Sequence, residues 1–309
     1  MQRAVSHSRT DKGSDEVPGT LFVVATPIGN LEDITFRALK ILKNCDLIAA
    51  ENRSHTKGLC GHYDIKTRIT AFNQHNQKVK APDLIRILKS GKDVALVTDA
   101  GTPGISDPGG TLIKMTASEG IRSTPVPGPS AVAAALSVSG FPSEKFVFLG
   151  FLPVRAGKRR KELKGLSNEQ RTMVLFEAPH RIVGTLKDIH DILGDREMVV
   201  LREISKVFEE IKRGPASLIY EDFRSRGVKG ELTLVMAGDK STRQGPILSE
   251  EVFERISELL EKGMTIRDIA GKVSGEYGLP YRKVYKESLA RMNEQEDVEA
   301  ALIDKKDKD

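Results

Sequence analysis

Two loops rich in proline and glycine carry the residues of this chain that could build a small-molecule site. The first, 25–30, reads Ala-Thr-Pro-Ile-Gly-Asn and follows an apolar run. The second, 98–110, reads Thr-Asp-Ala-Gly-Thr-Pro-Gly-Ile-Ser-Asp-Pro-Gly-Gly and follows another apolar run. In an open α/β sheet, ligands bind outside the carboxyl ends of strands, and glycine there lets the backbone approach a ligand closely. We therefore expect the two loops to form two walls of a pocket.

The composition of the loops narrows the ligand class. No G-x-G-x-x-G pattern follows a strand, and no glycine-rich loop ends in Gly-Lys-Ser or Gly-Lys-Thr. Proline stiffens both loops and removes backbone N–H donors, so a pyrophosphate cradle is a poor fit. Carbonyls, apolar surface and a few hydroxyls favour a nucleoside with a non-phosphate tail.

The overall composition is that of a globular protein with room for two domains. The chain has 309 residues, of which 39% are hydrophobic, and a formal net charge of +5. This mildly basic balance permits a nucleic-acid partner without requiring one. No apolar run reaches the about eighteen residues of a membrane span, so no membrane partner is expected. Two cysteines, Cys45 and Cys60, are too few for a disulfide framework and favour a cytoplasmic location.

A metal site is not expected. His55, Cys60 and His62 lie close in sequence, but their spacing matches no standard zinc pattern and no Cys-x-x-Cys pair is present.

Apolar runs of strand length alternate with segments of helical period, which is typical of an α/β sheet. The predicted strands are 21–25, 47–50, 94–98, 146–150, 173–176, 198–201 and 232–236. The predicted helices are 34–42, 84–88, 112–117, 131–137, 182–193, 206–213 and 217–226. Asp33 and Ser130 precede two of these helices and are expected to cap them.

Changes in composition predict the domain boundaries. We expect a disordered N-terminal extension over 1–19, an N-terminal α/β domain over 20–139 and a C-terminal α/β domain over 140–239. A polar stretch, 240–248, is interpreted as a linker. Helices at 250–260, 266–273 and 284–292 predict a helix-turn-helix-like module over 249–293, followed by a charged tail over 294–309.

Four ordered motifs together resemble one family. They are the two runs 25–35 and 99–109, then Pro127-Gly128-Pro129-Ser130-Ala131, then Phe176-Glu177-Ala178-Pro179-His180-Arg181. The set resembles the bacterial small-subunit ribosomal RNA cytidine 2′-O-methyltransferases of the tetrapyrrole-methylase superfamily, over residues 20–238. The resemblance implies a two-domain α/β fold of the class III methyltransferases with a small C-terminal helical module. It also implies a homodimer that acts on small-subunit ribosomal RNA or the assembled small ribosomal subunit.

The same resemblance implies a site for S-adenosyl-L-methionine in the cleft between the two halves. Carried over by motif, its cofactor-binding residues are Pro27, Gly29, Asp99, Gly101, Thr102, Ile105, Ser106, Ser130, Ala131, Phe176, Leu232 and Thr233. Most of these positions lie at or just past the ends of predicted strands, which agrees with the site expected from the loops alone.

The implied reaction is attack of a ribose 2′-hydroxyl on the sulfonium methyl, so the protein positions the partners and accepts a proton. A general base must lie within hydrogen-bond reach of that hydroxyl. The catalytic candidates are Glu51 and Glu177, ranked first, followed by His55 and His180. A cap, an ion pair or a satisfied core position is the competing interpretation for each, since most polar side chains simply satisfy hydrogen bonds.

One segment departs from the family pattern. The family carries Glu-Asp-Thr-Arg where this chain reads Glu51-Asn52-Arg53-Ser54. Asn52 cannot act as a base, and Ser54 cannot make the bidentate phosphate contact of an arginine. Arg53 could replace it, although neighbours on an extended segment point to opposite sides. The departure should affect RNA contacts more than cofactor binding.

A basic run is the second candidate for RNA contact. The RNA-binding candidates are Arg53 together with Arg155, Lys158, Arg159, Arg160, Lys161 and Lys164. If 158–166 is helical, positive charge crowds its first turns, where the helix dipole disfavours it and a phosphate backbone would relieve the cost. The competing interpretation is a solvated charge run.

Two other functions compete with this one. A methylase of the same superfamily could act on a tetrapyrrole or a protein side chain. A nucleic-acid-binding regulator could use the helices after 265 as a reader, with Arg282, Lys283 and Lys286 as base contacts, but it would leave the catalytic-type cleft unexplained.

Overall fold

The computed structural model describes residues 17–239 and 248–306, with 294–306 described by their backbone alone. These residues form two compact units. Residues 17–167 and 171–238 make the first unit, and 168–170 belong to the second, together with the residues from 239 onward. Apart from residues 17–19 and 248, the expected N-terminal extension and linker lie outside the described residues.

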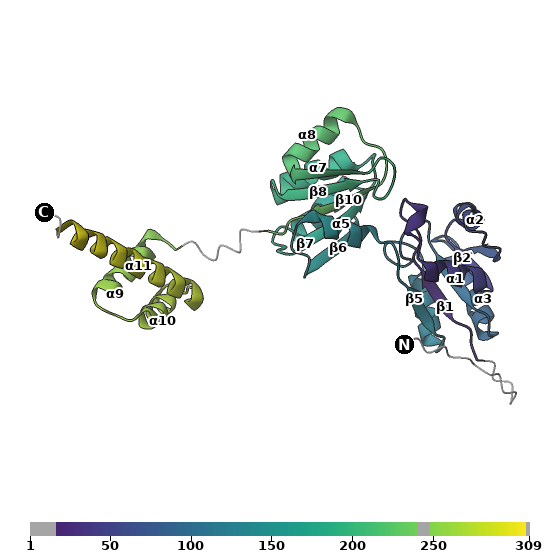
Figure 1. The fold of residues 1–309 in the computed structure, drawn as a ribbon, viewed down its shortest axis with the longest axis horizontal. Coiled ribbons are helices and arrows are strands. Elements are labelled where there is room, and N and C mark those ends of the chain that lie inside the picture. The colour runs from purple at the N-terminus through teal and green to yellow at the C-terminus, as the bar shows by residue number, and fades with distance from the viewer. Residues whose placement is uncertain (1–16, 240–247, 307–309) are drawn as a thin grey trace. The chain divides into compact units, whose positions relative to one another are not determined.

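The first sheet of the first unit is parallel, with strand order β3-β2-β4-β1-β5; Figure 1 labels β1, β2 and β5 of this sheet. Its strands are β1 (Leu21–Val24), β2 (Leu47–Ala50), β3 (Ile69–Ala71), β4 (Val94–Val97) and β5 (Ser123–Val126). The central strand β4 is buried along its whole length, because helices cover both faces of a parallel sheet. The carboxyl ends of β1 and β4, where the two loops begin, are therefore neighbours.

Alternate residues of β4 enter two different cores. Val94 and Leu96 pack with α3 (Gln77–Lys89) and α4 (Gly110–Ser118), whereas Ala95 and Val97 pack with α1 (Phe36–Asn44) and α2 (Arg53–His62). A one-residue shift of this strand would exchange the two sets of contacts, so the register that places the loops is strongly specified.

The second sheet has the order β6-β7-β10-β8-β9, in which only the β6–β7 pair is parallel. Its strands are β6 (Phe146–Phe151), β7 (Thr172–Glu177), β8 (Glu197–Arg202), β9 (Glu210–Pro215) and β10 (Leu232–Met236). One face packs against α6 (Ala156–Gly165), α7 (Ile182–Leu193) and α8 (Ala216–Arg226). The other face packs against α5 (Ala131–Ser139).

The structure corrects several predicted elements. The segment predicted as a helix over 206–213 overlaps β9, which pairs antiparallel with β8 from Arg202–Glu210 to Glu197–Pro215. Strands β3 and β5 and helix α2 are absent from the prediction. Asp33 does not cap α1: Thr35 does, accepting from the Ala38 N–H at 3.1 Å. Ser130 caps α5 as predicted.

The second unit is built from α9 (Glu250–Glu261), α10 (Ile266–Tyr277) and α11 (Tyr281–Lys306). Val252, Ile256, Ile269, Val273 and Val284 are fully or almost fully buried in its core. Gly278 ends α10 in the left-handed conformation. The sequence predicts that the third helix ends at residue 292. Its backbone instead continues through part of the expected tail to Lys306.

Candidate functional site

The two proline- and glycine-rich loops are joined directly to each other. The backbone N–H of Thr26 donates to the Gly101 carbonyl at 2.9 Å, and the Gly101 N–H donates back to the Thr26 carbonyl at 3.1 Å. The Thr26 hydroxyl also donates to the Thr98 carbonyl at 3.0 Å. Gly101 has a φ of +74°, a conformation that glycine adopts without strain. The loops after β1 and β4 therefore form one connected surface.

Both loops also approach the second half of the unit closely. A Cβ atom on Gly29 would lie 2.5 Å from the Ile204 carbonyl oxygen, and one on Gly150 would lie 3.0 Å from the Ser106 Oγ atom. Ser106 itself holds a φ of +65°, which is uncommon for a residue other than glycine. Close backbone approach thus has a packing role here, in addition to any contact with a ligand.

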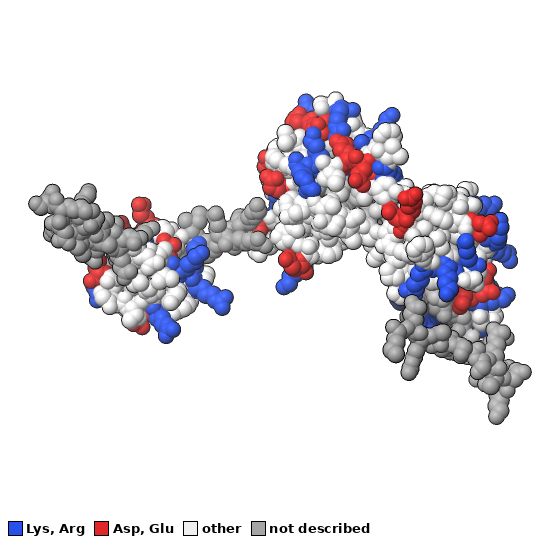
Figure 2. All heavy atoms as spheres, viewed as in Figure 1, with Lys and Arg blue, Asp and Glu red and all other residues white. Residues whose placement is uncertain are grey.

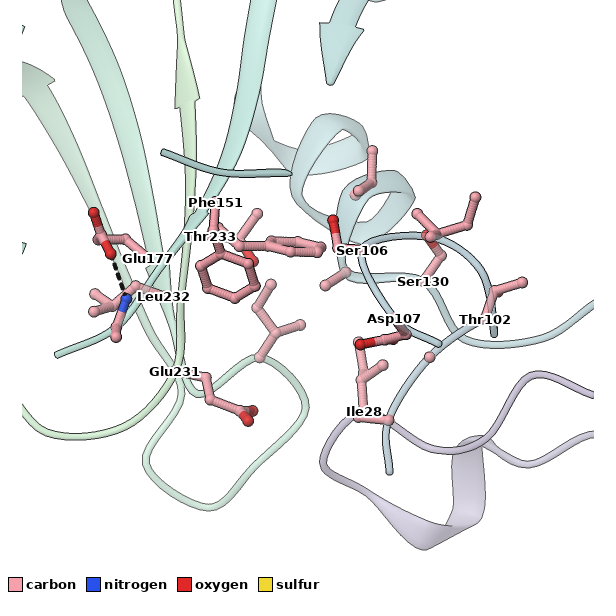
Figure 3. A pocket seen from close by; sticks show the side chains of 18 of the residues that line it. Ile28, Thr102, Ser106, Asp107, Ser130, Phe151, Glu177, Glu231, Leu232 and Thr233 are labelled. Atoms are coloured by element: carbon pink, nitrogen blue, oxygen red, sulfur yellow. Dashed lines mark hydrogen bonds between the residues drawn. The ribbon is translucent and has the colours of Figure 1, made fainter. Parts of the chain in front are cut away.

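A cavity of about 350 Å³ lies between the second loop, the start of α5 and the ends of β7 and β10 (Figure 3). We call it the first cavity. Nine of the predicted cofactor-binding residues line it: Gly101, Thr102, Ile105, Ser106, Ser130, Ala131, Phe176, Leu232 and Thr233. The Phe151 and Phe176 rings form an aromatic wall, with their centroids 5.6 Å apart. Its volume falls within the range of small-molecule sites.

The other three predicted cofactor residues, Pro27, Gly29 and Asp99, line a neighbouring cavity of about 620 Å³. We call it the second cavity. The two cavities adjoin, because Ile28 and Ala100 line both.

An acidic group surrounds the boundary between the cavities. Asp107 and Glu231 line the first cavity, and Figure 3 shows their side chains extending into the same space from opposite walls. The Glu51 carboxylate accepts the Asp99 backbone N–H at 3.3 Å. Burial raises the pKa of Asp107 to about 6, and the negative charges of Glu51, Asp99 and Glu231 add to the shift. Burial raises the pKa of Glu51 as well.

Sequence analysis named Asp107 within a motif and missed it as a site residue. Its neighbour Ser106 was selected, and the position of Asp107 in the same loop was the available signal. What marks Asp107 is its proximity to three other carboxylates: Asp99 from the same loop, and Glu51 and Glu231 from distant parts of the chain.

The Glu177 carboxylate makes hydrogen bonds and an ion pair within the protein. It is fully buried, with Oε1 accepting the Ala178 N–H at 2.8 Å and Oε2 accepting the Thr185 hydroxyl at 2.5 Å. Arg181 forms an ion pair with Oε1 at 3.2 Å. Figure 3 shows the carboxyl group pointing away from Asp107. Glu177 borders the first cavity, but these partners argue against the role of general base.

The two histidines lie in different places. His55 is exposed and lines the second cavity, close to the two joined loops. His180 is exposed and is not a lining residue of either cavity. Of the two, His55 alone has access to the site described here.

The segment that departs from the family pattern begins helix α2 and is not extended. Asn52 is its N-cap: the side-chain oxygen accepts the Ser54 N–H at 3.0 Å and the His55 N–H at 3.3 Å. An aspartate would make the same contacts, so the substitution preserves the cap. Arg53 is exposed at the first helical position, and Ser54 lines the second cavity.

The basic run forms α6 and its N-cap, and one of its members is wrongly assigned to RNA. Arg159 is 8% exposed, and its guanidinium bonds to the Asp188 carboxylate at 2.6 and 2.8 Å. It is therefore a structural residue. Arg160 is exposed and pairs with Asp188 and Asp191 at 3.5 and 3.6 Å.

The remaining cations of the run are available to a ligand. They are exposed and make no ion pair with another residue in the described ranges: Arg155, Lys158, Lys161 and Lys164. Charges of both signs are intermixed over α8, by contrast (Figure 2), where Arg224 and Arg226 pair with Glu221 and Asp222. The α6 run therefore differs from a charge-balanced surface helix.

Within the part of the chain that the structure describes, no His, Cys, Asp and Glu side chains gather in threes or more as metal ligands would. None of its helices has the length and apolar character needed to span a bilayer.

Comparison with known proteins gives a consistent result. The family model described as Tetrapyrrole (Corrin/Porphyrin) Methylases matches residues 20–219. Proteins named ribosomal RNA small subunit methyltransferase I match from Thermotoga maritima (48% identity, 71% of this chain, 99% of the relative) and Pseudomonas aeruginosa (40% identity, 88% and 98%).

A solved structure shares the fold. It is uroporphyrin-III C-methyl transferase from Thermus thermophilus complexed with S-adenyl homocysteine, with a TM-score of 0.52 and 17% identity over 70% of this chain and 97% of that one. The motifs at 25–35 and 99–109 lie within the matched range and form the joined loops of the site. The chain therefore belongs to the tetrapyrrole (corrin/porphyrin) methylase family, and within it to the group named ribosomal RNA small subunit methyltransferase I.

Proposed function

We propose that this chain is an enzyme that transfers a methyl group from S-adenosylmethionine to the ribose 2′-oxygen of a cytidine in small-subunit ribosomal RNA. The names of its relatives support the RNA substrate and the methyl transfer. The related structure with bound S-adenosylhomocysteine supports the cofactor.

The charge of the first cavity carries the proposal. Its lining holds no lysine or arginine among the described residues, but it includes the carboxylate of Asp107 and that of Glu231, which pairs with Lys206 at 3.0 Å. A cavity of this kind repels a phosphate and favours a cation. S-adenosylmethionine is a sulfonium cation with an uncharged nucleoside, so the residues present fit it.

The lining also divides into parts suited to that cofactor. Phe151, Phe176 and Ile28 would contact an aromatic base. The Thr102, Ser106 and Ser130 hydroxyls line the cavity and would hydrogen-bond to polar groups. When bound there, S-adenosylmethionine supplies a methyl group whose carbon–sulfur bond breaks as the carbon bonds to the ribose oxygen.

Asp107 is the general base in this proposal. It would accept the proton that the 2′-hydroxyl loses, and its pKa of about 6 leaves it mostly ionised at neutral pH. A pKa near the working pH is favourable for such a base. Glu51 and Asp99 act as positioning residues, because their charges help to raise that pKa.

The RNA would contact the exposed cations of α6. Lys158, Lys161 and Lys164 carry no ion-pair partner among the described residues, so their charges are free to neutralise phosphates. Exposed Arg53 at the start of α2 is a further candidate.

We also propose a homodimer and a cytoplasmic location. Val207 and Phe208 are 93% and 72% exposed in the segment between β8 and β9, and exposed apolar side chains of this size favour a protein contact. Free cysteines, Cys45 and Cys60, fit a reducing compartment. Sedimentation analysis of the wild type and of Phe208→Ser tests the dimer.

The decisive experiment uses small ribosomal subunits that lack the modification. Methyl-labelled S-adenosylmethionine is incubated with the protein and these subunits, and the RNA is digested to nucleosides. Label in 2′-O-methylcytidine is expected. Cofactor binding without transfer to subunits or bare RNA would contradict the proposal and favour a tetrapyrrole or protein substrate.

A further inference from the structure

The second cavity is larger than the first and differs from it in chemistry. Its volume is about 620 Å³, and its walls come from the 26–31 loop, the first half of α2, residues 98–100 and the side chains of Lys206 and Glu231. Lys206 and Glu231 pair with each other at 3.0 Å. A site of this size takes a ligand of nucleotide dimensions.

We infer that the second cavity is the subsite for the target nucleotide of the RNA, held with its ribose toward the wall shared with the first cavity. The inference rests on the proposed function, because it assumes that the methyl acceptor is a nucleotide. Ile28, Ala100 and Glu231 line both cavities, so a nucleotide in the second cavity would lie beside a ligand in the first.

Asp99 supplies a polar group for the ribose. It lines the second cavity, and its Oδ1 atom is buried with no hydrogen-bond partner among the described residues. A buried acceptor without a donor is costly. Rotation of the Asp99 side chain toward the cavity that it lines would let Oδ1 accept from a ribose hydroxyl, which would relieve this cost. Within an RNA strand the 2′-hydroxyl is the one hydroxyl donor that a nucleotide keeps. Asp99 would therefore orient the methyl-accepting oxygen, and Asp107 would accept its proton during the transfer.

The remaining walls suit the base and the backbone phosphates. Pro27, Leu31 and Leu59 give the cavity an apolar side against which a pyrimidine could pack. On the same helix as Leu59, His55 lines the cavity in the first turn of α2, where the helix dipole favours a phosphate. Ribose, base and phosphate thus each have a matching surface.

Gly58 allows this subsite to be blocked without disturbing the fold. It lies in α2 and lines the second cavity, and a Cβ atom built on it meets no atom within 4 Å. Gly61, in the same helix, also has no atom within 4 Å of its built Cβ, but it does not line the cavity. Gly58→Met and Gly61→Met therefore form a matched pair, with the same gain in helix propensity.

The experiment combines three readouts on the full chain. Calorimetry with S-adenosylhomocysteine reports the first cavity. Photocrosslinking reports the second, using short RNAs tiled over small-subunit ribosomal RNA, each with one 5-iodocytidine. Methyl transfer to unmodified small subunits reports activity. For the wild type and Gly61→Met we expect a crosslink to residues of α2 or of the 26–31 loop. For Gly58→Met we expect loss of that crosslink and at least about a tenfold fall in kcat/KM, with cofactor affinity unchanged.

Each alternative outcome has a distinct meaning. An unchanged crosslink and unchanged kcat/KM in Gly58→Met would overturn the inference. Loss of S-adenosylhomocysteine binding in Gly58→Met alone would also overturn it, by assigning the second cavity to the cofactor. A wild type that crosslinks in the second cavity but transfers no methyl group would support the subsite and count against the proposed function alone.

Discussion

Thr26 and Gly101 hold the two site loops together by a reciprocal pair of backbone hydrogen bonds, 2.9 and 3.1 Å long. Thr26 begins the loop that lines the second cavity, and Gly101 lines the first. One bridge therefore anchors a wall of each cavity. Neither bond uses a side chain. The link between the two loops therefore depends on their backbone geometry, and nearby side chains are left free for ligands.

Asp107→Asn tests the assignment of the general base. Replacing the carboxylate with an amide of about the same size should lower kcat by about 10²- to 10⁴-fold. S-adenosylhomocysteine binding, measured by calorimetry, should be retained, since it carries no sulfonium charge. A variant with wild-type kcat would show that another group accepts the proton.

The pH profile gives an independent check on the same residue. The pKa of Asp107 is raised to about 6, so its ionised form is lost as the pH falls through that value. Single-turnover methyl transfer by the wild type should therefore fall below pH 6, and this limb should be absent in Asp107→Asn. A raised carboxyl pKa means that the native state binds the proton more tightly, so ionised Asp107 costs stability at neutral pH. Asp107→Asn should keep or increase the free energy of unfolding at pH 7.

Substitutions in α6 should separate RNA contact from structure. Lys158→Ala and Lys161→Ala should each reduce the slope of log affinity against log salt by about 1, measured by fluorescence anisotropy with ribosomal RNA fragments. Their unfolding in urea should match the wild type. Arg159→Ala should instead lose up to about 3–5 kcal/mol of stability, because it leaves the buried Asp188 carboxylate with only the longer ion pair to Arg160 at 3.5 Å. Lysine variants with an unchanged salt slope would remove α6 from the RNA-binding surface.

The central strands were predictable from sequence and three strands were not, for a common reason. Predicted strands 47–50 and 232–236 have the observed bounds, and both are buried runs. The missed strands β3, β5 and β9 are all edge strands. An edge strand contacts less core and can carry charged residues or proline. In β5, Pro125 interrupts the apolar pattern, and in β9 charged residues suggested a helix.

The site shows a similar contrast between what the sequence predicts and what it does not. The lining residues of the first cavity followed from motif positions at strand ends, such as Thr102 and Phe176. Side-chain roles depended on which partners the fold brings into contact. Glu177 accepts a hydrogen bond from Thr185 and forms an ion pair with Arg181, and Arg159 forms an ion pair with Asp188. None of these pairs has a sequence signal of its own.

Glu177→Gln should behave as a structural substitution. The amide retains one acceptor but loses the charge opposite Arg181 and places an NH₂ group among the donors Ala178 N–H and Thr185 Oγ1. We expect a loss of about 1–3 kcal/mol in urea unfolding. Methyl transfer per folded molecule should stay close to wild type. A stable variant with more than a hundredfold loss of kcat would restore Glu177 as a candidate base.

Substitutions of Asn52 test how the departure from the family pattern is tolerated. Its side chain caps α2 through the Ser54 and His55 N–H groups, and both of these residues line the second cavity. Asn52→Ala should cost about 1 kcal/mol of stability and raise the KM for the RNA, because the first turn of α2 loses its cap. Asn52→Asp should keep the cap and gain about 0.3–1 kcal/mol from its charge at the helix N-terminus. That charge would also face incoming phosphates. A raised KM in Asn52→Asp with full stability would therefore place the RNA backbone at this helix end, whereas a KM unchanged in both variants would place it elsewhere.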